Sequence, residues 1–181
     1  MRGPLAGKRK DEGPAVAAVW ENDLVARGMA RWRRARPDID CSGKAIVGRV
    51  LQMHDVILKA VNRTLARHGL KYPAYAVLAT LRVEGAPYRM SPSALGQTLL
   101  LTSGGLSNLL RRMEKAGHVR RMADARDGRG VIVELTERGL SLADAAMADH
   151  AAVERQLVAV LPPELRDDVA RALSLMITAH A

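Results

Sequence analysis

The segment 124–130 is the feature that most limits how this chain can fold. It holds two glycines, which allow a tight turn, and it separates two short runs with the composition of β-strands. Residues 118–122 come before it, and residues 131–135 follow with apolar side chains at every second position. The pattern predicts a β-hairpin that carries arginine side chains outward at its tip.

Two short helices are expected directly before this hairpin. An N-cap serine followed by Pro92 begins a helix that reaches about Leu100. Thr102 or Ser103 then caps a second helix, which runs to Ala116. Two helices joined by so short a turn form a helix-turn-helix, and the hairpin that follows them would be the wing of a winged helix-turn-helix domain.

The second of these helices has an apolar face and a polar face. Its buried stripe is expected to comprise Leu106, Leu109, Leu110 and Met113. The opposite side carries Ser103, Ser107, Asn108, Arg111 and Arg112. Short polar side chains can reach base edges in a major groove, and arginine can bond guanine or hold a phosphate. We therefore expect these five polar residues to bind DNA, although an ordinary solvated helix face is the alternative, which the adjacent hairpin makes less favourable.

The positive charge of the chain is concentrated around this region. The whole sequence has a formal net charge of +9 and a pI near 10.4, which suits either a polyanionic partner or simple solubility. Residues 111–130 hold seven cations and three anions, whereas residues 137–181 hold four arginines and seven acids. Such a local concentration of cations is what a nucleic-acid-binding surface requires.

Amphipathic helices are predicted on both sides of the DNA-binding region. Apolar residues recur at helical steps over 15–36, 44–67, 137–161 and 165–177. Their apolar faces exceed what a small winged domain can cover, so we expect these helices to pack on each other and on a second copy of the chain. The predicted fold is mostly α-helical with a small β-hairpin wing, that is, a winged helix-turn-helix plus a helical dimerisation domain.

The sequence divides into four parts. Residues 1–14 form a flexible basic arm, 15–68 the N-terminal helices of the dimerisation domain, 69–136 the winged helix-turn-helix domain, and 137–181 the C-terminal helices of the dimerisation domain. No apolar run approaches the roughly 20 residues of a membrane span, and the N-terminus lacks the apolar core of a signal peptide. The single cysteine, Cys41, suggests a reducing compartment, so we expect a cytoplasmic protein.

No group of residues predicts catalysis, a metal site or a cofactor. The five histidines, at positions 54, 68, 118, 150 and 180, match no metal-ligand spacing. The sequence also lacks a Ser-His-Asp order, an H-E-x-x-H motif and a phosphate-binding loop. Cys41 lies in a linker beside Asp40, whose negative charge disfavours a reactive thiolate, so redox sensing is the less favoured interpretation of this cysteine.

Three motifs follow one another across the DNA-binding region. Residues 113–119 read M-E-K-A-G-H-V, residues 124–129 read D-A-R-D-G-R, and residues 135–139 read L-T-E-R-G. They resemble the L-E-x-x-G-L-V, D-x-R-D-x-R and L-T-x-x-G motifs of the MarR family of bacterial winged helix-turn-helix regulators. Met113 and His118 replace two customary leucines. The order of the predicted helices extends the resemblance over residues 44–177.

The resemblance implies a homodimer that binds palindromic operators in double-stranded DNA and a repressor that is released by a small molecule or an oxidant. On this basis Arg129 would enter the minor groove, where A·T tracts favour arginine, and Arg126 would be the second DNA-binding residue of the wing. Asp127 would hold an arginine of the hairpin, and Asp124 would support the turn; the alternative for both is a weak surface ion pair. A ligand-independent architectural DNA-binding protein is the alternative function.

The residues from Trp32 onward resemble the W-x-x-x-R-P-x-x-D stretch of a MarR branch with an added N-terminal helix. Some members of that branch respond to urate and have an Asp and an Arg where this sequence has Ala76 and Leu109, so urate is disfavoured as a ligand. Trp32, together with Met53 and Tyr75, forms the candidate effector pocket. The alternative for Trp32 is simple packing at an interface.

Overall fold

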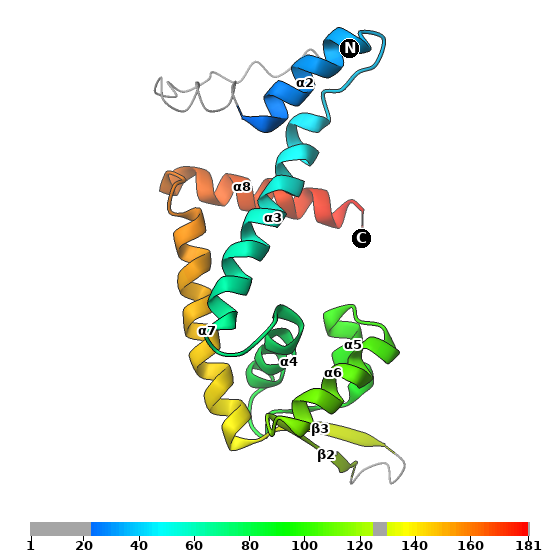
Figure 1. The fold of residues 1–181 in the computed structure, drawn as a ribbon, viewed down its shortest axis with the longest axis vertical. Helices are drawn as coiled ribbons and strands as arrows, with labels where there is room; N and C mark the ends of the chain where they lie inside the picture. Colours follow the sequence, from blue (N-terminus) through cyan, green and yellow to red (C-terminus); the bar gives the residue numbers. More distant parts are fainter. Residues whose placement is uncertain (1–22, 125–129, 181) are drawn as a thin grey trace. The chain divides into compact units, whose positions relative to one another are not determined.

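The computed structural model describes residues 23–124 and 130–180. Its elements are α2 (Leu24–Ala35), α3 (Lys44–Ala66), α4 (Tyr72–Val83), β1 (Arg89–Met90), α5 (Pro92–Leu99), α6 (Ser103–Lys115), β2 (Val119–Ala123), β3 (Val131–Leu135), α7 (Glu137–Val158) and α8 (Pro163–Thr178) (Figure 1). The order confirms the predicted fold class, which is mostly helical with a small antiparallel sheet. The arm predicted for residues 1–14 lies outside the described residues.

The chain forms two compact units. The first reaches Val56 and contains α2 with the beginning of α3. The second starts at Ile57 and contains the rest of α3 and all later elements. The functional division at residues 68/69 and 136/137 stays a prediction.

Asp23 joins the two helices of the first unit. Its carboxylate accepts the backbone N–H of Ala26 at 2.8 Å and so caps α2. The other carboxylate oxygen accepts the Nε–H of Arg49 on α3 at 2.7 Å. The N–H of Ala26 and, to a smaller extent, the guanidinium of Arg49 hold the pKa of the Asp23 carboxyl below its usual value. At its other end α2 stops before Pro37, as the position of this proline predicts.

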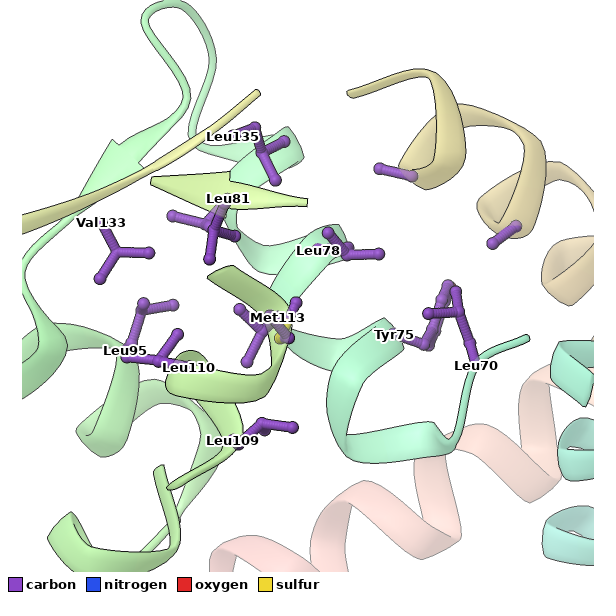
Figure 2. Close-up of a cluster of buried hydrophobic side chains, with 14 of the residues drawn as sticks. Leu70, Tyr75, Leu78, Leu81, Leu95, Leu109, Leu110, Met113, Val133 and Leu135 are labelled. Carbon is purple, nitrogen blue, oxygen red and sulfur yellow. The ribbon is translucent and has the colours of Figure 1, made fainter. Parts of the chain in front are cut away.

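The hydrophobic core of the second unit lies where α4, the two helix-turn-helix helices, the sheet and α7 meet. Figure 2 shows the buried side chains converging from these elements. The largest of those with almost no exposed surface are Val61, Leu65, Val77, Leu78, Leu81, Leu95, Leu110, Val119 and Val133. The sequence has no phenylalanine, and leucine and valine fill this core instead. The core therefore holds the helix-turn-helix and the sheet together as one body.

A three-stranded antiparallel sheet follows the helix-turn-helix, with β3 between β1 and β2. In the hairpin, Val119 pairs with Leu135 and Ala123 pairs with Val131. The sequence pattern places the first of these strands at 118–122, one residue before β2. It does not reveal β1, because a strand of two residues is too short to have a period.

A tight corner connects the end of α6 to the start of α7. The hydroxyl of Thr136 accepts the N–H of Gly139 at 3.0 Å and caps α7, as predicted. The same hydroxyl donates to the carbonyl of Gly117 at 2.7 Å. Gly117 has a φ of +73°, which favours glycine, and Gly139 packs directly against the carbonyl of His118. The L-T-x-x-G sequence therefore fixes where α7 leaves the winged domain.

After this corner, α7 packs along α4. It ends at Val158, before Pro162-Pro163 as predicted, and α8 begins at Pro163. No described helix combines the length and the apolar character needed to cross a membrane.

Candidate nucleic-acid interface

Side-chain N-caps determine where the two helices of the helix-turn-helix begin. The hydroxyl of Ser91 accepts the N–H of Ala94 at 3.2 Å at the start of α5. Thr102, and not Ser103, caps α6 by accepting the N–H of Gly105 at 3.3 Å. Between the helices, Leu100 adopts a left-handed conformation that makes the turn. The two helices therefore begin where their N-cap residues predict.

The two faces of α6 are sorted as the sequence predicts. Leu106, Leu109, Leu110 and Met113 are all buried in the core. Ser103, Ser107, Asn108, Arg111 and Arg112 are all exposed. Because one stripe anchors the helix, the polar face is presented to solvent in a fixed orientation. Contact of these five residues with DNA stays a prediction.

Two residues of the polar face are bonded to each other. The guanidinium of Arg111 donates an Nη2–H to the side-chain oxygen of Asn108 at 2.7 Å. The residues are three positions apart, a spacing that places side chains side by side on a helix. The structure therefore joins two residues that the sequence suggests only as separate DNA contacts.

A residue that the sequence does not single out holds α6 to the wing. Arg121 on β2 donates from its guanidinium to the backbone carbonyl of Ser107 at 3.3 Å. The carboxylate of Glu114 accepts the backbone N–H of Arg121 at 3.1 Å and lies 3.4 Å from its Nε. Both side chains are partly exposed. We call Arg121 and Glu114 the α6–β2 clamp, because they fix the helix against the first strand of the hairpin.

Removing the clamp is expected to weaken specific DNA binding more than non-specific binding. Arg121→Ala should lower affinity for the preferred duplex by about ten-fold, because α6 becomes less well oriented while its polar face is kept. Arg120→Ala is the matched control, since Arg120 is the adjacent arginine and pairs with Glu134 instead. Fluorescence anisotropy with specific and scrambled duplexes measures both affinities. Equal losses of specific binding in the two variants would count against the clamp.

The described part of the wing supports a hairpin closed next to its tip. The N–H of Asp124 donates to the carbonyl of Gly130 at 2.9 Å, so both ends of the tip segment are tied together. Across the strands, Arg120 donates to Glu134 at 2.7 Å. Arg126, Asp127 and Arg129 lie outside the described residues, and their predicted roles stay predictions.

The candidate effector residues are divided between the two units. In the first unit, Trp32 is 44% exposed and the Lys44 ammonium lies 4.1 Å from the centre of its ring; Met53 is also exposed. In the second unit, Tyr75 is buried and stacks on His150 with ring centres 4.5 Å apart. Burial raises the pKa of the Tyr75 hydroxyl. A pocket shared by Trp32, Met53 and Tyr75 therefore stays a prediction.

Apolar side chains occupy the two positions where the urate-responsive branch has an Asp and an Arg. Ala76 is half-buried on α4, and Leu109 is buried on α6. Cys41 is 7% exposed, whereas redox-sensing cysteines are solvent-accessible. Within residues 23–124 and 130–180, no three His, Cys, Asp or Glu side chains are placed so that they could hold a metal ion.

His118 makes stability depend on pH. Burial and, secondarily, the charge of Arg138 lower the pKa of this imidazole from 6.5. The unfolded chain therefore binds more protons than the folded chain just below pH 6.5, and stability should fall as the pH drops through this range. Urea unfolding at pH 7.5 and pH 5.5 measures the fall, which should be smaller in His118→Gln. An unchanged difference between the two pH values in this variant would contradict the assignment.

Comparison with known proteins identifies the fold and the family together. A family model described as MarR family matches residues 68–130, which include the helix-turn-helix and β2. The transcriptional regulator PecS of Dickeya dadantii is 32% identical over 136 residues, covering 75% of this chain and 82% of PecS. This chain belongs to the MarR family. MarR-family transcriptional regulators bind DNA, and PecS is named as an HTH-type transcriptional regulator.

Solved MarR-family structures have the same fold. AbsC of Streptomyces coelicolor superimposes with a TM-score of 0.71 at 26% identity, covering 78% of this chain and 95% of AbsC. Sco3205 of the same organism, solved in complex with DNA, gives a TM-score of 0.70 at 23% identity over 79% of this chain and 94% of Sco3205. At that identity the second comparison supports the fold alone.

Proposed function

We propose that this MarR-family protein is a homodimeric repressor that binds a palindromic operator and is released by a small-molecule effector. The observation that carries the proposal is α6, whose apolar stripe is buried while Ser103, Ser107, Asn108, Arg111 and Arg112 are all exposed. A helix presented in this way can enter a major groove. Because operator DNA is in the cytoplasm, we place the activity there.

The apolar surface of α8 supports a homodimer. Leu165, Val169, Leu173 and Met176 recur at helical steps and are between 37% and 42% exposed. On α3, Ile46, Val47, Val50 and Leu51 are exposed as well. An exposed apolar stripe on a helix marks an interaction site, and identical chains most often pair about a two-fold axis. Two chains related in this way would bind a DNA sequence with the same symmetry.

In the proposed complex, each protomer lays α6 in one major groove. The two helices would lie about 34 Å apart, one turn of the duplex. Arg126 and Arg129 of the wing would reach the flanking minor groove, and Asp124 and Asp127 would orient the hairpin. The exposed arginines of α6, together with the two wing arginines, would also make affinity fall steeply with salt.

A cavity behind α6 supports release by a small molecule. It has a volume of about 410 Å³ and is lined by residues that include Leu70, Ala74, Leu109, Met113 and His118. Because Leu109 and Met113 belong to the buried stripe of α6, a ligand in this cavity would contact the back of the DNA-binding helix. Trp32, Met53 and Tyr75 remain the residues that we propose from the sequence for an effector pocket.

A gel-shift with the DNA upstream of the protein's own gene tests the function. Wild type is expected to form a discrete complex, and Arg129→Ala should weaken it by about ten-fold, because one arginine contact per protomer is lost. If the variant binds as tightly as wild type, the wing assignment is wrong. Binding that tolerates a scrambled sequence and responds to no ligand would favour a ligand-independent architectural DNA-binding protein.

A further inference from the structure

The bond between Asn108 and Arg111 gives the exposed face of α6 a defined hydrogen-bonding character. A guanidinium can only donate, so the atom of Asn108 that lies 2.7 Å from Nη2 of Arg111 is necessarily the amide oxygen. The amide NH₂ of Asn108 keeps its two donors, and Arg111 keeps four of its five N–H groups. The pair therefore presents mainly donors to anything that approaches α6.

The base edges of DNA differ in how well they suit such a pair. In the major groove guanine presents two acceptors, N7 and O6, whereas adenine presents the N7 acceptor next to the N6 amino donor. Asparagine reads adenine by donating to N7 while its oxygen accepts from N6. Here the oxygen of Asn108 already accepts from a guanidinium, and this positive charge would oppose the N6 amino group. The hydrogen-bonded pair of Asn108 and Arg111 therefore suits guanine better than adenine at the same position.

The position of the pair is also fixed relative to the wing. The clamp residue Arg121 donates to the carbonyl of Ser107, the residue directly before Asn108, and contacts Glu114 one turn after Arg111. The helix is therefore attached to β2 on both sides of the pair, through the backbone carbonyl of Ser107 and the side chain of Glu114. Because the helix is fixed against β2, the side chains of Asn108 and Arg111 would meet the same base position in each complex.

We propose that Asn108 and Arg111 act as one unit that selects guanine, and rejects adenine, at one position of each operator half-site. The inference rests on the proposed function, because it requires α6 to enter a major groove. It goes further by naming the base and by making Asn108 a positioning residue for Arg111.

The first test uses duplexes selected from a randomised pool with wild-type protein. The selected half-sites are expected to share a guanine whose replacement by adenine lowers affinity about 5- to 150-fold. Replacing this guanine by N7-deazaguanine should also lower wild-type affinity, because one acceptor is removed. Arg111→Ala should lose the preference for guanine, since the O6 acceptor that distinguishes guanine from adenine then has no guanidinium partner.

The second test asks whether the two residues act together. Asn108→Ala should reduce the preference for guanine over adenine several-fold, and the double variant should show the same preference as Arg111→Ala alone. Lys115→Ala is the matched control, because it removes one positive charge from the same helix. It should weaken binding to both duplexes equally and leave the guanine preference unchanged.

The outcomes separate this inference from the proposed function. If wild type prefers no sequence in the pool, the proposed function fails, and the inference fails with it. If wild type selects a half-site but no guanine in it depends on Arg111, the function stands and the inference is wrong. Additive effects of Asn108→Ala and Arg111→Ala on the guanine preference would also overturn it, since independent contacts add.

Discussion

Replacing Gly139 by alanine is expected to destabilise the protein by about 3 kcal/mol, the upper end of the range for overpacking. A Cβ at this position would overlap the carbonyl oxygen of His118. That carbonyl cannot move freely, because it accepts the backbone N–H of Thr136 at 3.1 Å and its hydroxyl at 3.2 Å. The first turn of α7 would have to separate from the turn that follows α6. Thermal unfolding should show a Tm lowered by roughly 10 °C.

Gly104→Ala is the control for this prediction. A Cβ at Gly104 would meet no atom within 4 Å, so this substitution should leave the Tm unchanged or raise it slightly. Both positions lie in helices, and only the space around them differs. A Tm of Gly139→Ala equal to that of wild type would show that the corner can relax and that its close packing does not determine stability.

Placing a charge in the apolar stripe of α8 is expected to separate the proposed dimer. Because the dimer is two-fold symmetric, each substitution would place one carboxylate from each chain in the interface. An unpaired buried charge costs several kcal/mol. Wild type should sediment at twice the 19.6 kDa chain mass, and the double variant Val169→Asp, Leu173→Asp at the mass of one chain. The variant should also lose operator binding by at least about 100-fold, because each half-site would then bind one chain independently.

Arg171→Asp provides the matched control for the dimer. It introduces the same residue into the same helix, at a position whose side chain is 74% exposed and pairs only weakly with Asp168. This variant should sediment like wild type. If the Val169 and Leu173 variant also remains a dimer, the partner chain does not cover the α8 stripe, and another surface must form the interface.

The helix-turn-helix could be predicted from the sequence because its signals are local. Ser91 and Thr102 sit three residues before the N–H groups that they cap, and the apolar stripe of α6 follows the helical period. The same reasoning gives Thr136 as the N-cap of α7. Each of these features depends on residues within a few positions of each other, so one sequence is enough to find them.

Features that depend on contacts between elements could not be predicted in this way. The clamp joins Arg121 to Ser107, fourteen residues earlier, and it exists only because β2 runs back along α6. β1 pairs with β3 across more than forty residues. By contrast, the spacing of Asn108 and Arg111 was a local signal that could have indicated their hydrogen bond.

The most direct test of the account compares affinity for a specific and a scrambled duplex of equal length at one salt concentration. Fluorescence anisotropy with the upstream DNA fragment should give a specific affinity at least about 1,000-fold tighter than the scrambled one, with two chains bound to each operator. Steep salt dependence should be seen for both duplexes, because phosphate contacts are common to them. Affinities within a factor of about ten of each other would contradict a sequence-specific regulator.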